Sequence, residues 1–87
     1  MNWEKYAWLR RGNRRIEILK QISNSKSPVT VKEIKIKCKI ALPQSSITIK
    51  ELLDKNLIEC LNLKDKIGKL YIITKEGTSL LGVIQND

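Results

Sequence analysis

Residues 42–58, LPQSSITIKELLDKNLI, contain a helix start, an amphipathic helix and the beginning of a strand in one run. Pro43 suits the first turn of a helix, where its missing N–H costs nothing because the first amides have no intrahelical partner. Apolar or small side chains then recur on one helical face: Leu42, Ser45, Ile49, Leu52 and Leu53. We expect a helix over 43–55 that ends at Asn56, which tolerates the left-handed conformation usual for glycine at this place.

The segment before this helix is expected to form another helix over 31–38. Thr30 followed by Glu33 has the spacing of a capping box, in which the threonine side chain accepts a hydrogen bond from the amide three residues on. Apolar side chains follow at i, i+3 and i+7: Val31, Ile34 and Cys38. The alternation over 34–40 is also typical of a half-buried strand, and the cap favours the helix.

A third helix is expected further upstream, over 13–23. Asn13 is a suitable capping residue, and the run of breakers SNSKSP over 23–28 ends the pattern. Between them the apolar residues have helical spacing: Ile16, Ile18, Leu19 and Ile22.

Downstream of Asn56 the hydrophobic period changes from about 3.6 to 2, which predicts strands. The two alternating segments are LIECLN (57–62) and KLYIIT (69–74). They flank the charged, glycine-bearing segment KDKIGK (64–69), so we expect a β-hairpin with a basic tip. Beyond it, leucines and an isoleucine at helical spacing predict a short final helix: Leu80, Leu81 and Ile84.

The first twelve residues, MNWEKYAWLRRG, hold both tryptophans and one of the two tyrosines. Trp3, Tyr6 and Ala7 would share one helical face, which could pack either on this domain or on a second subunit. We therefore divide the chain into an aromatic and basic segment (1–12) and a folded domain (13–87). The order of elements predicts an α+β winged helix-turn-helix: a three-helix core, a two-stranded β-hairpin wing and a short C-terminal helix.

Three segments carry a family resemblance: TVKEI (30–34), LPQSSITIKELLDKNLI (42–58) and KLYIITKEG (69–77). They resemble winged-helix regulators of the multiple-antibiotic-resistance and arsenic-repressor type, above all small archaeal members that begin with a segment like WLRRGNRR (8–15). The resemblance covers residues 8–81, and its most specific part is the spacing of Tyr71, Thr74 and Gly77. Asn56 stands where such families usually have glycine, and Lys35 where they usually have alanine.

The resemblance implies that the helix over 43–55 enters the major groove of double-stranded DNA. The residues opposite its apolar stripe then become candidates for base contacts: Pro43, Gln44, Ser46, Ile47, Thr48 and Lys50, with Glu51 as a further possibility. Gln44 suits adenine, Lys50 suits guanine or phosphate, and Ile47 offers an apolar contact to a thymine methyl group.

Two basic groups are further candidates for DNA contact. The wing (63–69) carries Lys64, Lys66 and Lys69, which could reach backbone phosphates or the minor groove; the alternative is a merely solvated hairpin tip. The densest basic cluster lies at the start of the first core helix: Arg10, Arg11, Arg14 and Arg15. Because the helix dipole disfavours cations there, we expect compensation by phosphate, by glutamate or by a second subunit.

The composition agrees with a nucleic-acid partner. Seventeen Lys and Arg against nine Asp and Glu give a formal charge of +8, and the isoelectric point is about 9.7. The chain has no histidine, no paired-carboxylate constellation and no glycine-rich phosphate loop, so we expect no enzyme. We also expect no cofactor, no metal site and no recognisable sensor motif. Cys38 and Cys60 are interpreted as buried small hydrophobes, with a redox-switch disulfide as the alternative.

An 87-residue chain buries a small core, so we expect a homodimer. The aromatic N-terminus and the final apolar residues Leu80, Leu81 and Ile84 are the candidate dimer surfaces. The sequence shows no run of about 18 apolar residues and no signal-peptide core, which indicates a cytoplasmic protein without membrane contact. Two other functions stay open: a winged domain that contacts proteins, and a non-specific DNA-binding or RNA-binding protein.

Overall fold

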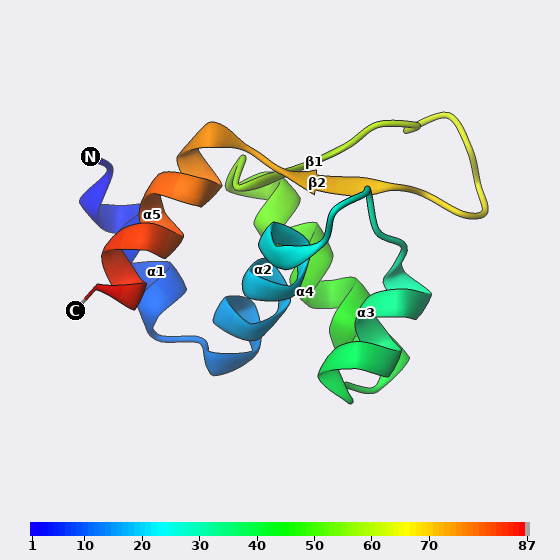
Figure 1. Ribbon diagram of the computed structural model, residues 1–87, viewed down its shortest axis with the longest axis horizontal. Coiled ribbons are helices and arrows are strands. Elements are labelled where there is room, and N and C mark those ends of the chain that lie inside the picture. The colour runs from blue at the N-terminus through cyan, green and yellow to red at the C-terminus, as the bar shows by residue number, and fades with distance from the viewer. Residues whose placement is uncertain (87) are drawn as a thin grey trace.

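A computed structural model describes residues 1–86 as five helices and one two-stranded antiparallel sheet (Figure 1). In chain order the elements are α1 (Trp3–Arg10), α2 (Asn13–Asn24), α3 (Val31–Cys38), α4 (Leu42–Asp54), β1 (Ile58–Cys60), β2 (Tyr71–Ile73) and α5 (Lys75–Gln85). The predicted α+β winged helix-turn-helix is confirmed.

The ends of the helices follow local chemistry, with one exception to the prediction. The Thr30 side chain accepts a hydrogen bond from the Glu33 amide at 3.2 Å and so starts α3, as the capping box predicts. Asn56 has φ 59° and ends α4 in the left-handed conformation. Asn13, predicted to be a cap, is instead the first helical residue, because Gly12 takes the extended capping position and no side chain caps α2.

The core lies where α2, α3 and α4 meet the hairpin. Its buried side chains come from every element: Leu9, Ile18, Leu19, Ile22, Ile34, Ile49, Leu52, Leu57, Ile58, Tyr71, Leu80 and Leu81. Burial of one such side chain is worth about 1.5–3 kcal/mol. Leu80 and Leu81, suggested as dimer contacts, are therefore core residues, because α5 folds back onto α1 and α2.

The strands of the wing are shorter than the alternating pattern predicts. The ladder pairs Ile58 with Ile73 and Cys60 with Tyr71, and an isolated bridge joins Val29 to the other edge of β2. Beyond the ladder one backbone bond follows, from the Leu61 amide to the Leu70 carbonyl at 2.9 Å. The chain then opens into a long loop that projects past α3 (Figure 1).

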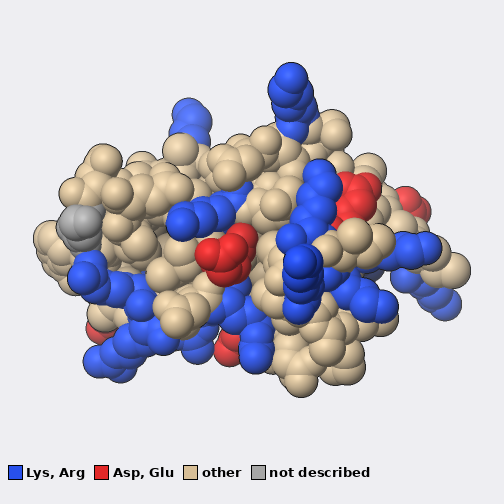
Figure 2. Space-filling view, turned by 60° about the horizontal axis from the view of Figure 1, so that its bottom comes forward, with Lys and Arg blue, Asp and Glu red and all other residues tan. Residues whose placement is uncertain are grey.

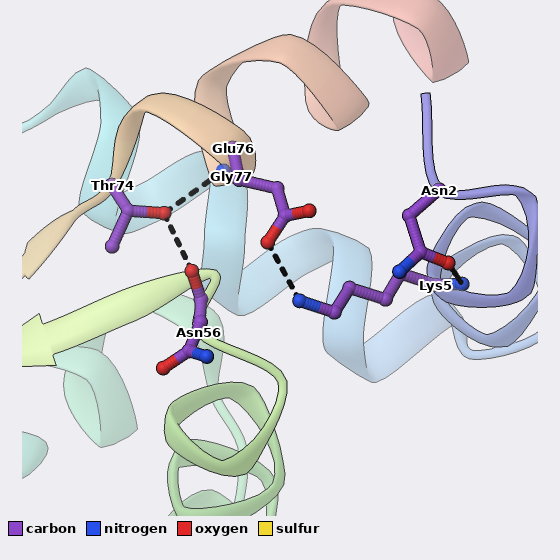
Figure 3. Close-up of polar contacts among 6 residues, drawn as sticks. All are labelled: Asn2, Lys5, Asn56, Thr74, Glu76 and Gly77. Carbon is purple, nitrogen blue, oxygen red and sulfur yellow. Dashed lines mark hydrogen bonds and ion pairs between the residues drawn. The ribbon is translucent and has the colours of Figure 1, made fainter.

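The joint between wing and α5 explains the Tyr71, Thr74 and Gly77 spacing. The Thr74 hydroxyl donates to the Asn56 carbonyl at 2.8 Å and accepts from the Gly77 amide at 3.0 Å, which ties the end of α4 to the start of α5 (Figure 3). A Cβ on Gly77 would overlap the carbonyl oxygen of Leu57, so glycine is required by close backbone approach.

The N-terminal helix is attached to the same body. The Asn2 side chain accepts from the Lys5 amide at 3.1 Å and caps α1. The Lys5 ammonium lies 2.7 Å from a carboxylate oxygen of Glu76, which links α1 to α5 (Figure 3). Leu9 is fully buried, so α1 is packed into the core of the domain.

Candidate nucleic-acid interface

One side of α4 is buried and the other is open to solvent. The open side carries five of the six predicted base-contact residues: Pro43, Gln44, Ser46, Ile47 and Lys50. Ile47 is 60% exposed although it is apolar, and its neighbour Ile49 is buried in the core. Ile47 therefore offers an apolar contact on the open side of α4, between Gln44 and Lys50.

Two residues of α4 are placed differently from the expectation. Thr48 is 2% exposed, so its inclusion among the outward residues is wrong. It lies three residues after Ser45 and four before Leu52, on the stripe that packs inward. Leu42, predicted on that stripe, is 46% exposed because it lies in the first turn, at the rim of a hollow between α3 and the wing.

Beside the open side of α4 lies a basic hollow of about 890 Å³ that only the fold assembles. It is lined by residues of α1, α2, α4 and the α1–α2 connection, among them Trp8, Arg11, Arg14, Arg15, Ile47 and Glu51. Arg11 and Arg14 are exposed there. The space-filling view in Figure 2 shows Lys and Arg spread over one face of the molecule, with few Asp and Glu among them.

Arg15 is held within the chain. Its guanidinium lies 4.1 Å from the centroid of the Trp8 ring and donates to the Trp8 carbonyl oxygen. Its Nη2 lies 3.8 Å from a carboxylate oxygen of Glu51 on α4. Lys55 approaches the same ring, with Nζ 5.4 Å from the centroid. The expected compensation by glutamate is therefore present for this cation. The Arg15–Glu51 pair ties α2 to α4, and the contact of Arg15 with Trp8 ties α1 to α2.

Arg10 is also engaged within the N-terminal segment. Its Nη1 donates to the Tyr6 hydroxyl at 2.7 Å, and its guanidinium lies 5.9 Å from the centroid of that ring. The four arginines therefore differ: Arg10 and Arg15 lie against aromatic rings, whereas Arg11 and Arg14 line the basic hollow and are exposed.

The wing loop is organised by one side chain that sequence reasoning missed. The Asn62 amide nitrogen donates to a carboxylate oxygen of Asp65 at 2.9 Å and to the Gly68 carbonyl at 3.1 Å. Its side-chain oxygen accepts from the Leu70 amide at 2.7 Å. Gly68 has φ 71°, a left-handed conformation that glycine adopts without strain. Asparagine at the base of a hairpin tip was the available signal.

The three predicted wing lysines lie around this loop. Lys64 and Lys66 are exposed and Lys69 is half-buried. Between them Ile67 is 91% exposed, which no sequence argument anticipated. The available signal was an apolar residue in an otherwise charged hairpin tip.

Both cysteines are free thiols and partly buried, packed against the core. The Cys38 sulfur lies 3.9 Å from the Glu17 carbonyl oxygen, and the Cys60 sulfur lies 3.5 Å from the Asn62 side-chain oxygen. Burial, followed by the charge of Glu17, raises the pKa of the Cys38 thiol above its ordinary value. A raised pKa lowers the thiolate fraction and so makes Cys38 a poor nucleophile.

This pKa shift predicts the pH dependence of alkylation. In a Cys60→Ser variant, Cys38 is the single thiol, and its iodoacetamide reaction is expected to reach half its maximal rate at a higher pH in the folded protein than in urea. Folding disfavours the thiolate, so the pH profile must move upward. The measurement is the alkylation rate by mass spectrometry from pH 7 to 11. A folded-state midpoint at or below the unfolded one would contradict the burial argument.

No helix within residues 1–86 is long and apolar enough to cross a membrane. Over the same range, no group of three His, Cys, Asp or Glu side chains lies together in a way that could hold a metal ion.

The core of α2, α3 and α4, with one side of α4 exposed to solvent, and the basic hairpin that follows it define a winged helix-turn-helix domain. No protein-family model matches the sequence, and no curated protein does. Among solved structures the domain is similar to Staphylococcus aureus MarR in complex with salicylate and kanamycin, with a TM-score of 0.75 and 31% identity. That match covers 84% of this chain and 49% of the other, so this chain spans about half the length of the S. aureus protein.

Two further structures support the same fold. A MarR/EmrR family transcriptional regulator from Acinetobacter sp. ADP1 gives a TM-score of 0.75 at 23% identity, over 92% of this chain and 58% of that one. A cysteine variant of E. coli MarR gives 0.76 at 22% identity, over 98% and 68%. At these identities the likeness shows a shared fold, that of MarR-type winged-helix proteins.

Proposed function

We propose that this protein is a transcriptional regulator that binds double-stranded DNA in a sequence-specific manner, with α4 in the major groove. The open side of α4 carries the proposal, because Gln44, Ile47 and Lys50 are exposed in a row on a helix whose other side is fixed in the core. An α-helix fits the major groove, where amide, apolar and cationic side chains distinguish base pairs. The structural likeness to MarR-type regulators supports this function.

Basic groups on both sides of α4 suit the phosphate backbone. Arg11 and Arg14 line the hollow that Ile47 borders, so phosphates beside the major groove would lie within their reach. The wing lysines would contact the backbone or the adjacent minor groove. Arg15, held by Trp8 and Glu51, would position α4 relative to α2 rather than contact DNA.

We also propose that the regulator is a homodimer whose contacts are made by α1 and α5. Trp3 is 67% exposed and packs edge-on against Tyr6, with ring centroids 5.6 Å apart. Ile84 of α5 is partly buried on the same end of the molecule, where α1 and α5 are in contact. Exposed aromatic side chains are enriched in subunit contacts, and a dimer would present two copies of α4 to two half-sites.

The test is selection of binding sequences from a random duplex library at two salt concentrations. An enriched palindrome whose affinity falls with salt supports a dimeric, sequence-specific regulator. Salt-sensitive binding without enrichment would make the protein a non-specific nucleic-acid binder. Absence of binding at low salt would overturn the proposal and favour a protein-interaction module.

Substitution of the α4 residues tests their roles. Gln44→Ala and Ile47→Ala are each expected to lower affinity for the selected site about tenfold and to relax preference at one base pair, because one base-edge contact is lost. The measurement is competition binding against single-base variants of the site. Ile36→Ala is the matched control, since Ile36 is 64% exposed on α3 and lies outside α4. An unchanged base preference in the α4 variants would remove these residues from base recognition.

A further inference from the structure

We infer that Ile67 is an apolar wedge that enters the DNA minor groove from the wing and inserts between two base pairs. The inference deepens the proposed function and rests on it: it assigns the wing a role in sequence selection, beyond attraction to phosphate. It predicts that the binding site contains an easily unstacked step at the place the wing reaches.

The first observation is the exposure of Ile67. At 91% it is the most exposed of the large apolar side chains described. Ile67 borders a hollow of about 510 Å³ that Val31 and Leu42 also line, yet its side chain stays almost entirely open to solvent. An apolar side chain that is this exposed can enter the minor groove without unpacking any part of the protein core.

The second observation is the set of hydrogen bonds that shapes the tip. Asn62 holds the loop from both sides, through the Gly68 carbonyl directly after Ile67 and through the Leu70 amide. The Asp65 amide also donates to the Asn62 carbonyl at 3.0 Å, which closes a turn inside the loop. An inserting side chain must be held in place before it meets DNA, because ordering a flexible loop on binding costs free energy that would offset the free energy gained by insertion.

The third observation is the charge around Ile67. Lys66 precedes it and is exposed, Lys64 lies nearby in the loop, and Lys69 follows at the base. A phosphate backbone runs along each side of the minor groove. Cations on both sides of an apolar side chain could therefore each face one backbone while the apolar side chain enters the groove. A protein partner with an acidic rim would share part of this chemistry. The hollow that both Ile67 and Leu42 line places the tip beside the first turn of α4, the proposed DNA-binding helix, which favours DNA.

Insertion has a known physical consequence. Isoleucine and similar apolar side chains that enter the minor groove unstack a base step and bend the duplex. Pyrimidine–purine steps unstack most easily, so a wedge discriminates among sequences without a hydrogen bond to any base. Ile67 would therefore select a flexible step, TA or CA, outside the base pairs that α4 contacts.

The experiment uses the full chain and the selected duplex with 2-aminopurine substituted, one position at a time, along the segment next to the major-groove site. Unstacking raises the fluorescence of this base. We expect a several-fold increase at one step when the protein binds, and loss of that increase in Ile67→Ala. We also expect Ile67→Ala to lower affinity about tenfold for a TA step and much less for a stiff AA step, because only the wedge depends on the deformation.

Two controls separate the wedge from other effects of the loop. Leu63→Ala removes a similar apolar side chain, 69% exposed in the same loop, and is expected to keep the fluorescence increase. Ile67→Met keeps a flexible apolar side chain and is expected to restore most of it. A fluorescence increase that survives in Ile67→Ala would overturn the wedge, as would equal losses on TA and AA steps.

The outcomes also distinguish this inference from the proposed function. If the wild-type protein binds the duplex with no fluorescence increase at any position, DNA binding stands and the wedge is wrong. If the wild-type protein binds no duplex at all, the proposed function fails and the wedge falls with it. If Ile67→Ala keeps full DNA affinity and loses binding to another protein instead, the tip is a protein contact and the wedge is overturned.

Discussion

Gly77→Ala is expected to destabilise the fold by about 3 kcal/mol, because the new methyl group would overlap the carbonyl oxygen of Leu57. That carbonyl belongs to the backbone, which cannot rotate away as a side chain does. It also accepts the Thr74 amide at 3.0 Å, so moving it strains the joint that Thr74 makes between α4 and α5. For a domain of this size, the melting temperature should fall by roughly 15 °C.

Gly82 provides the control for this prediction, since it lies in the same helix α5 and a Cβ there would meet nothing within 4 Å. Gly82→Ala is expected to stabilise the protein by up to about 1 kcal/mol, because alanine is the better helix former. Thermal unfolding followed by circular dichroism measures both variants. If the two melting temperatures shift in the same direction by similar amounts, the close approach at Gly77 is not what requires glycine.

The helices could be predicted because each has one buried face. In α4 the apolar stripe marks both the extent of the helix and the side that stays open, so 43–55 was close to the observed Leu42–Asp54. Thr48 was misplaced because a threonine at the margin of the stripe is small enough to be buried and polar enough to be expected outside. The sequence pattern carries no information that separates those two cases.

The wing and the basic hollow could not be predicted in detail because their geometry depends on residues far apart in the chain. The alternating pattern predicts a strand that continues to Asn62. Instead, the Asn62 side chain binds the Leu70 amide and the Gly68 carbonyl in place of the ladder hydrogen bonds. Arg15 and Glu51 approach each other only after α2 and α4 have packed. The pairing of this arginine with glutamate was one expected alternative; the tryptophan ring that supports it was not foreseen.

Removal of the wing charges is expected to have the largest effect on DNA binding. In the triple variant Lys64→Ala, Lys66→Ala and Lys69→Ala, three phosphate contacts are lost, so the slope of log affinity against log salt should become shallower by about 2.7. Between 50 and 200 mM salt, wild-type affinity should therefore fall about fortyfold more than that of the variant. Binding should weaken on all sequences, since phosphate contacts do not read bases.

A second triple variant separates this effect from net charge. Lys20→Ala, Lys26→Ala and Lys75→Ala remove the same three charges from α2, the α2–α3 connection and α5, so both variants have a formal charge of +5, that is 8 − 3. Fluorescence anisotropy over a salt series measures both slopes. The control is expected to keep nearly the wild-type slope, because a contact releases counterions and a distant charge does not. Equal slopes in the two variants would place the wing outside the DNA interface. The interface would then consist of the exposed side of α4 together with Arg11 and Arg14.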